Sequence, residues 1–138
     1  DAKAFRIRAR AIRFSADSRW LGITADPTGD ENTRIYAGLV EGPETDLREL
    51  MPASRSVAHF AEAVDASSDF IVTSNQRDKK VFDLYRVNPA GGPPVLMATN
   101  PGNVGWWGVD TTGQLRARAQ IKGDQVLLSD LAPSRAAG

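Results

Sequence analysis

Few residues in this chain have the types and spacing that hydrolytic chemistry needs. His59 is the only histidine among 138 residues, so a Ser-His-Asp triad would have to use it as the general base. A serine nucleophile commonly occupies a G-x-S-x-G turn, and Gly38 and Gly42 have this glycine spacing without a serine between them. The chain contains no cysteine, which excludes a thiolate nucleophile, a thiolate zinc site and a disulfide. We therefore predict no catalytic residue, no bound cofactor and no metal in this chain.

Two acidic segments look like functional motifs, and each is better explained by turn chemistry. Asp110-Thr-Thr-Gly113 differs from the Asp-Thr-Gly of aspartic proteases by one extra threonine, and no second aspartate stands in an equivalent context. The segment from Asp26 to Asn32 carries carboxylate and amide oxygens that suit calcium. It lacks the alternating acidic positions and the distant bidentate glutamate of a calcium loop. We predict a turn at the first segment and a solvated loop at the second.

A charged cluster at positions 77–80 lies directly before Phe82. One interpretation is that Arg77, Asp78 and Asp83 contact a neighbouring domain or a peptide at the rim of the fold. The other, which we favour, is that Arg77 and Asp78 hold their own loop in place, with Asp83 as a partner. All three remain candidates for a rim or interdomain contact.

Two adjacent tryptophans, Trp106 and Trp107, are further candidates for a contact surface. Successive residues of a strand point to opposite faces, so one ring is expected in the core and the other toward a neighbouring sheet, a ligand or solvent. We expect packing between sheets, and Trp107 is retained as a candidate rim or interdomain contact.

The composition is that of an ordinary soluble domain. Hydrophobic residues make up 41% and charged residues 25%, and 17 basic residues balance 17 acidic ones. A nucleic-acid binder is expected to show a basic excess or stripe, and the sequence has neither. No apolar run approaches the roughly 20 residues that span a bilayer, so we expect neither nucleic acid nor a membrane as a partner. The first residue is Asp1 and no signal-peptide pattern follows, which predicts a piece of a longer protein. The compartment is unknown from the sequence, with the cytoplasm favoured over others.

Apolar residues alternate with polar ones over most of the chain, which predicts strands. The expected strands lie at 5–10, 12–15, 20–24, 34–40, 60–64, 70–74, 82–87, 95–99, 104–109, 115–120 and 125–131, with a weaker edge strand at 46–51. Turn-forming residues separate them, as at 16–19, 65–69 and 110–113. The single helical alternative is 54–64, where Val57, Phe60 and Val64 have helix-like spacing.

The order strand, aspartate turn, strand, polar loop and tyrosine strand recurs along the chain. Ile35-Tyr36 corresponds to Leu84-Tyr85, and the repeated features are offset by roughly 44–50 residues. Units of this length built from short strands are typical of propeller blades, and a single β-sandwich is the alternative. We predict an all-β fold of about three antiparallel propeller blades, a partial β-propeller. Tyr36 and Tyr85 are expected at the same place in successive blades, packed between sheets.

The predicted boundaries follow from these repeats. Residues 1–13 form a leading strand that completes a blade or swaps into another copy, 14–52 and 53–101 form blades, 102–131 form a partial blade, and 132–138 form a frayed tail. Propellers close with four to eight blades, so three leave apolar faces uncovered, with Ile7, Phe14, Trp106 and Leu127 among the residues exposed. We therefore expect a homodimer, formed by stacking blades across a two-fold axis or by exchanging the strand at 5–10.

Two stretches resemble known propeller sequences. Phe14-Ser-Ala-Asp-Ser-Arg-Trp-Leu21 resembles the F-S-x-D-G-x-x-I/L-A hairpin of Tol-type and peptidase propellers, with Ser18 in place of the glycine. The segment from Thr73 to Val87 resembles the S-N-x-R-D-x-x-x-F-D-L-Y-R-V segment of N-terminal propellers in the prolyl oligopeptidase family of serine peptidases. That family includes dipeptidyl aminopeptidases and acylaminoacyl peptidases. The likeness continues through 88–106 and covers residues 12–131 in all.

The resemblance implies that the parent protein is a serine peptidase whose catalytic α/β-hydrolase domain lies C-terminal to this chain. In that family the propeller caps the catalytic cavity and limits entry to short peptides, so the hydrolase domain and short peptides are the implied partners. The adjacent glutamates with which dipeptidyl aminopeptidases hold the amino terminus of the substrate do not occur here, so that role does not transfer. Two alternatives stay open: a Tol-type binding or scaffold propeller with no enzyme attached, and an independent β-sandwich interaction domain.

Overall fold

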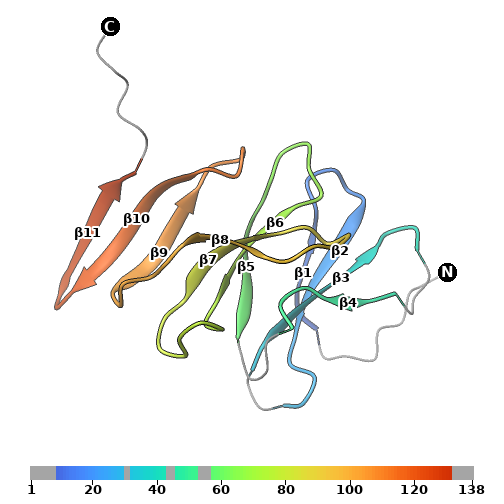
Figure 1. Ribbon diagram of the computed structural model, residues 1–138, viewed down its shortest axis with the longest axis horizontal. Helices are drawn as coiled ribbons and strands as arrows, with labels where there is room; N and C mark the ends of the chain where they lie inside the picture. The colour runs from blue at the N-terminus through green and yellow to red at the C-terminus, as the bar shows by residue number, and fades with distance from the viewer. Residues whose placement is uncertain (1–8, 30–31, 43–45, 53–56, 132–138) are drawn as a thin grey trace, which may run out of the picture.

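The computed structural model describes residues 9–29, 32–42, 46–52 and 57–131 (Figure 1). This part of the chain contains eleven strands and no helix, and the strands form three antiparallel sheets. Within the same residues no helix is long and apolar enough to cross a membrane. The prediction of an all-β fold is therefore confirmed.

Each sheet is a meander of consecutive strands. Sheet 1 contains β1 (Ala9–Phe14), β2 (Trp20–Ala25), β3 (Arg34–Leu39) and β4 (Arg48–Glu49). Sheet 2 contains β5 (Ala58–Ala63), β6 (Phe70–Ser74), β7 (Asp83–Val87) and β8 (Val95–Ala98). Sheet 3 contains β9 (Val104–Val109), β10 (Leu115–Lys122) and β11 (Gln125–Asp130). Because β1 pairs with β2, the described part of the predicted leading strand completes sheet 1.

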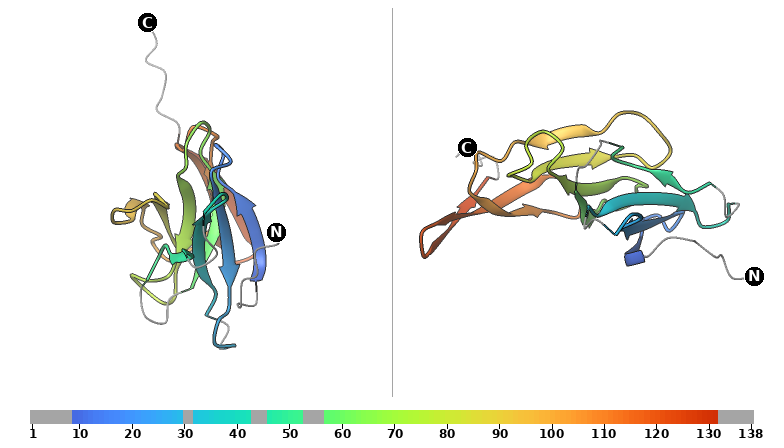
Figure 2. Two further views of the ribbon diagram at one scale, coloured as in Figure 1. Left: turned by 90° about the vertical axis from the view of Figure 1, so that its right-hand side faces the viewer. Right: turned by 90° about the horizontal axis from the view of Figure 1, so that it is seen from below.

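The three sheets pack face against face in the order in which they occur in the chain (Figures 1 and 2). Sheet 2 stands in the middle, and its strand β6 shows why. Phe70 and Val72 face sheet 1 while Ile71 faces sheet 3, and all three side chains are fully buried. A strand that is covered on both faces needs apolar residues at consecutive positions, which explains the unbroken apolar run at 70–72.

Two apolar cores hold the stack together. The core between sheets 1 and 2 contains Ile35, Ala37, Leu50, Met51, Ala58, Phe70, Val72, Tyr85 and Val87, and the core between sheets 2 and 3 contains Val64, Ile71, Leu84, Val104 and Trp107. Phe60 packs against the first core, with its ring centroid 4.9 Å from that of Phe70. Each core takes residues from two sheets, so neither sheet of a pair buries its apolar face without the other.

The hairpin turns between the first two strands of the three sheets share one hydrogen bond but differ in the residue that is left-handed: Ser18 and Gly113 are the last residue of their turns, whereas Ala66, with a φ of +53°, is the third residue of the second turn. A hydrogen bond joins the amide N of one residue to the carbonyl O three residues earlier: Ser18 to Ser15, Ser67 to Val64, and Gly113 to Asp110. Ser18 occupies the glycine position of the propeller-type hairpin and has a φ of +61°, in the left-handed region that glycine favours. Gly113, at the same place in the third turn, has a φ of +84°. The turns predicted at 16–19, 65–69 and 110–113 are confirmed.

Hydrogen bonds also join each of these turns to the next. Asp17 N donates to Ser67 O at 3.2 Å, and Asp65 N donates to Thr111 O at 2.7 Å. In addition, the Ser68 hydroxyl donates to the Asp17 carboxylate. The three hairpins therefore lie side by side along one edge of the stack.

The helical alternative at 54–64 is wrong, because 58–63 form strand β5. A β-bulge between Phe60 and Glu62 shifts the pairing of β5 with β6. As a result, Phe60 packs toward sheet 1 and Val64 toward sheet 3, whereas a helix would place both on one face.

Other expectations are met in part or fall outside the described residues. Of the edge strand expected at 46–51, only Arg48 and Glu49 pair with β3. Phe14, Trp106 and Leu127 are 56%, 53% and 41% exposed, as expected. Phe14 and Trp106 lie on faces turned away from sheet 2, whereas Leu127 lies on the same face of sheet 3 as Trp107, which is turned toward sheet 2. Ile7, most of the strand at 5–10 and the tail at 132–138 lie outside the described residues.

The two tyrosines occupy the same register position but have different surroundings. Tyr36 pairs across from Ile23, and Tyr85 pairs across from Val72 at the corresponding place in sheet 2. Tyr85 lies in the core between sheets 1 and 2 and is 5% exposed. Tyr36 is half-buried, because its neighbours Ile35 and Ala37 face sheet 2 and Tyr36 faces away from it. The predicted equivalence is confirmed, but only Tyr85 packs between two of the described sheets.

This difference predicts unequal losses of stability. Tyr85→Ala should lower the free energy of unfolding by about 3–5 kcal/mol, as for other large buried aromatic residues. Tyr36→Ala should cost less, about 1 kcal/mol, because no described sheet covers the face on which Tyr36 lies and its side chain is only partly buried. Urea unfolding at high dilution, followed by tryptophan fluorescence, measures both. Equal losses would contradict the assignment of Tyr36 to an uncovered face.

Candidate functional site

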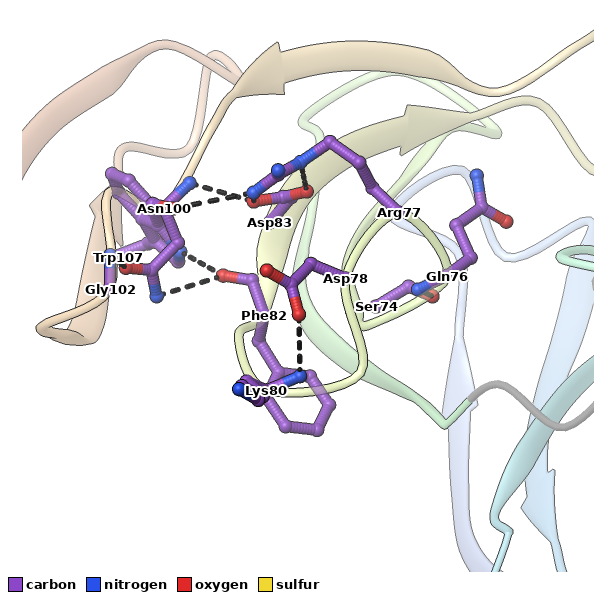
Figure 3. Close-up of polar contacts among 10 residues, drawn as sticks. All are labelled: Ser74, Gln76, Arg77, Asp78, Lys80, Phe82, Asp83, Asn100, Gly102 and Trp107. Carbon is purple, nitrogen blue, oxygen red and sulfur yellow. Dashed lines mark hydrogen bonds and ion pairs between the residues drawn. The ribbon is translucent and has the colours of Figure 1, made fainter.

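A buried carboxylate lies at the junction of sheets 2 and 3 (Figure 3). Asp83, the first residue of β7, has a fully buried side chain that pairs with Arg77 from the preceding loop. Arg77 Nε donates to Asp83 Oδ2 at 2.5 Å, and Arg77 Nη2 donates to Asp83 Oδ1 at 2.9 Å. The backbone N of Asn100 donates to the same Oδ1 at 2.7 Å. The carboxylate therefore joins its own loop to the connection between β8 and β9.

Asn100 extends this network to the start of sheet 3. Its side-chain N donates to Val104 O at 2.8 Å and to Phe82 O at 3.3 Å. Its side-chain O accepts from the backbone N of Gly102 and of Val104, and its own carbonyl accepts from Arg77 Nη2 at 3.3 Å. Every polar atom of this buried amide has a partner, so Asn100 fixes the turn through which the chain passes from sheet 2 to sheet 3.

Trp107 completes the network from the side of β9. Its ring is 8% exposed, and its Nε1 donates to Phe82 O at 3.1 Å. Trp106 is 53% exposed, so the two adjacent rings lie on opposite faces as predicted. We name the set Arg77, Asp83, Asn100, Phe82 and Trp107 the polar joint.

Opposing effects act on the ionisation of Asp83. Burial alone would raise the pKa of this carboxyl, but the hydrogen bonds from Arg77 and from Asn100 N outweigh it and hold the pKa below its ordinary value. The same hydrogen bond to Asp83 raises the pKa of Arg77. The pair is therefore a bidentate ion pair with its anionic side buried.

The four residues predicted from sequence as contact candidates divide into two groups. Arg77, Asp83 and Trp107 meet in the polar joint, which confirms that Arg77 holds its own loop with Asp83 as partner. Asp78 does not join them, and its Oδ1 accepts from Lys80 N at 2.9 Å within the loop. A contact of these residues with another domain stays a prediction.

A cleft of about 430 Å³ opens beside the polar joint, between β5 and β6 of sheet 2 and β9 of sheet 3. His59, Thr73, Phe82, Trp106 and Trp107 are among the residues that line it. The ring of His59 lies against that of Phe82, with centroids 5.8 Å apart. The side chain of His59 is partly open to solvent, but the atoms packed around its ring withdraw it from water and lower its pKa below the ordinary value of 6.5. The imidazole is therefore neutral at pH 7. An aromatic wall with a neutral imidazole suits an apolar or aromatic side chain.

The sequence did not indicate this cleft. Its walls come from strands of two different sheets, which lie at least thirty positions apart in the sequence. Nothing around His59 distinguishes it from an ordinary surface residue. The only indication in the sequence was the pair Trp106 and Trp107, because adjacent residues of a strand point to opposite faces and one of the two rings therefore had to lie outside the core. Asn100 was missed for a similar reason: an Asn-Pro-Gly sequence predicts a turn, and its role comes from the two sheets that this turn connects.

The acidic segments act as turns where they are described. Asp110 accepts hydrogen bonds from Thr112, Gln114 and Arg116, and these bonds hold its pKa well below the usual range. Asp26 Oδ1 accepts from Gly29 N at 2.8 Å, while positions 30 and 31 lie outside the described residues. In the described part of the chain no three His, Cys, Asp or Glu side chains gather as metal ligands do.

No protein-family profile matches the chain, and no curated protein matches it.

The polar joint predicts a strong coupling between Arg77 and Asp83. Arg77→Met should lower the free energy of unfolding more than the loss of an exposed ion pair does, because it leaves the buried Asp83 carboxylate without its cation. Combining it with Asp83→Asn should recover part of this loss, with an interaction energy of about 1–3 kcal/mol in a double-mutant cycle. Urea unfolding at pH 7 measures all three variants.

Arg116→Met is the matched control. It removes an ion pair of similar length, 2.6 Å between Arg116 Nε and Asp110 Oδ2, from an exposed turn. Its cost should stay below about 1 kcal/mol. An Arg77→Met variant no less stable than this control would show that the joint does not hold the sheets together.

The lowered pKa of Asp83 also predicts a pH dependence. A carboxyl with a depressed folded-state pKa contributes its full stability above the unfolded value of about 3.9, and loses it as the pH falls through the folded value. The difference in unfolding free energy between the wild type and Asp83→Asn should therefore be constant from about pH 7 to 5 and shrink below about pH 4. Urea unfolding at each pH gives this difference, and a gap that widened in acid would contradict the sign of the shift.

Proposed function

We propose that the three sheets are consecutive blades of a partial β-propeller, and that this chain is a non-catalytic part of a serine peptidase of the prolyl oligopeptidase family. One observation carries the first part of the proposal. Each sheet is a meander that begins with a hairpin whose turn has the same N–H to C=O hydrogen bond between its fourth and first residues, and hydrogen bonds from Asp17 to Ser67 and from Asp65 to Thr111 join these hairpins in series. Repeated meanders placed side by side in chain order are the pattern of propeller blades.

The peptidase assignment is supported by the place of the resembling residues. Arg77 and Asp83 belong to the stretch from Thr73 to Val87 that resembles the peptidase propellers, and they form the ion pair of the polar joint. In that stretch the arginine and the aspartate are thus the residues that join one sheet to the next. We expect the same arginine and aspartate in other propellers whose neighbouring sheets are joined by this ion pair.

In the proposed parent protein this chain would cap a C-terminal α/β-hydrolase domain and limit entry to short peptides. The cleft beside the polar joint supports a contact with peptide, because the rings of His59 and Phe82 lie against each other in its wall. Asp78, in the exposed loop next to the joint, is the residue of the predicted set best placed to meet the hydrolase domain.

The second candidate is a binding or scaffold propeller of the Tol type with no enzyme attached. It is compatible with the hairpin from Phe14 to Leu21, whose sequence resembles Tol-type and peptidase propellers alike. In this hairpin Ser15 Oγ accepts from Trp20 N at 3.0 Å and Asp17 Oδ1 accepts from Arg19 N at 3.1 Å. A β-sandwich has less support, since it has two facing sheets, whereas here the middle one of three sheets is covered on both faces.

The reading frame that follows Gly138 in the parent gene separates the two candidates. A G-x-S-x-G segment followed by an aspartate and a histidine would support the peptidase. A stop codon shortly after a further blade would support the scaffold propeller and reject the peptidase.

The purified chain should not hydrolyse chromogenic aminoacyl or dipeptidyl substrates, because it has neither a nucleophile turn nor a triad. The measurement is release of the chromophore by the purified chain, with His59→Ala as the matched variant. Turnover that survives purification and disappears in His59→Ala would show that this chain is itself catalytic.

A further inference from the structure

The cleft between sheets 2 and 3 contains two polar side chains whose hydrogen-bonding groups are open to a ligand. His59 of β5 and Thr73 of β6 pair directly across from each other, and both line the cleft. Neither side chain takes part in a hydrogen bond with the part of the chain that the structure describes. Cross-strand neighbours have Cβ atoms about 4.5–5.5 Å apart, so a single ligand atom can contact both side chains.

The corresponding threonine of sheet 1 has a different environment. Thr24 and Thr73 hold the same register position, one residue after the partner of the tyrosine in the third strand. Thr24 pairs with Ala11, and its Oγ1 donates to the carbonyl O of Ala11 at 3.4 Å. At the same place sheet 2 has a histidine instead of an alanine, and the hydroxyl of Thr73 makes no such bond. The pair of open polar groups is therefore particular to the junction of sheets 2 and 3 among the described sheets.

The cleft is wide because Trp107 cannot lie where Phe60 lies in the preceding junction, although the two hold the same place in β9 and β5. Phe60 packs over Gly22 so closely that a Cβ at Gly22 would stand 2.6 Å from Phe60 Cζ. Ile71 occupies the place of Gly22 in sheet 2, and its side chain excludes a ring from that position. The ring of Trp107 is instead bonded to Phe82 O. The cavity is about 170 Å³ in the first junction and about 430 Å³ in the second.

The walls of the cleft are aromatic and uncharged. The ring of Phe82 lies against that of His59, and Trp107 contributes to the wall on the side of β9. None of the described residues that line the cleft carries a charge at pH 7, since His59 is neutral there. A charged ligand would lose its hydration without gaining a counter-ion, whereas an aromatic ring would pack against the rings of the wall. The cavity volume lies in the range of sites for small ligands.

A hydroxyl group on an aromatic ring matches these features best. A neutral imidazole has one donor nitrogen and one acceptor nitrogen, and a threonine hydroxyl both donates and accepts. A phenol hydroxyl placed between His59 and Thr73 can therefore donate to one of them and accept from the other. An indole N–H only donates, and a phenyl ring would leave both side chains without a partner.

We propose that the cleft binds the side chain of a tyrosine residue in a peptide, with its ring on Phe82 and its hydroxyl bonded to His59 and Thr73. This inference rests on the proposed contact with peptide, and it names the residue that the peptide presents. The bound tyrosine would contact sheet 2 and sheet 3 at once, beside the polar joint.

Titration of the complete chain with single-residue probes tests this proposal. The probes are N-acetyltyrosinamide and N-acetylphenylalaninamide, which differ only by the phenol hydroxyl. The NMR signal of the Trp107 indole N–H reports on binding, because Trp107 lines the cleft. The tyrosine probe should shift this signal saturably. The phenylalanine probe should have a dissociation constant about three- to tenfold higher, as expected for the loss of a hydrogen bond.

Substitutions in the polar pair should remove this preference. Thr73→Val deletes the hydroxyl and keeps the branched shape, so it should lower the preference for tyrosine while the phenylalanine probe binds as before. Combining it with His59→Leu should abolish the preference. Thr111→Val is the matched control, because Thr111 is exposed in a hairpin turn outside the cleft, and this variant should keep the wild-type preference.

Equal binding of the two probes to the wild type, or the absence of a saturable shift at Trp107, would overturn the proposal. The reading frame after Gly138 is determined separately. A hydrolase in that frame together with equal binding of the probes would leave the proposed function standing and reject the tyrosine site. A preference for the tyrosine probe together with an early stop codon would retain the site and reject the peptidase.

Discussion

The middle strand β6 carries Phe70, Ile71 and Val72 in succession, so sheet 2 must be covered on both faces before it is stable in water. Sheet 1 supplies one cover and sheet 3 the other, and neither cover has a large core of its own. The fold is therefore a series of sheets in which stability comes from the contacts between neighbours. Because sheet 2 needs a sheet on each face, the chain forms three separate meanders that pack against one another in sequence order.

Apolar contact alone does not determine how two sheets are placed relative to each other, since it is non-directional. The polar joint supplies the direction between sheets 2 and 3. Asp83 accepts from two different segments, Asn100 closes the turn into β9, and Trp107 reaches back to Phe82 O. A buried charge of this kind is costly unless it is fully paired. Here Arg77 donates to both carboxylate oxygens of Asp83, and the backbone N of Asn100 donates to one of them.

The proposed function depends on the repeat. At some equivalent positions of the three sheets the exposed fraction follows the presence of a neighbouring sheet: Leu84 faces sheet 3 and is fully buried, whereas Leu128, at the same place in sheet 3, is 71% exposed. The same joint that orients sheet 3 also shapes the cleft, because Phe82 and Trp107 belong to both. A substitution in the joint would thus change the geometry of a binding surface as well as the stability of the stack.

The sequence by itself determined the strands, their turns, the opposite faces of Trp106 and Trp107, and the pairing of Arg77 with Asp83. These features depend on residues within one strand or one hairpin, where the two-residue period and turn chemistry act locally. The tertiary structure alone decided that β5 carries a bulge and that His59 borders a cleft. It also decided that Tyr85 is buried while Tyr36, at the same register position, is not. Burial depends on which sheet lies opposite, and that sheet is formed by residues about fifty positions away; no local pattern contains this information.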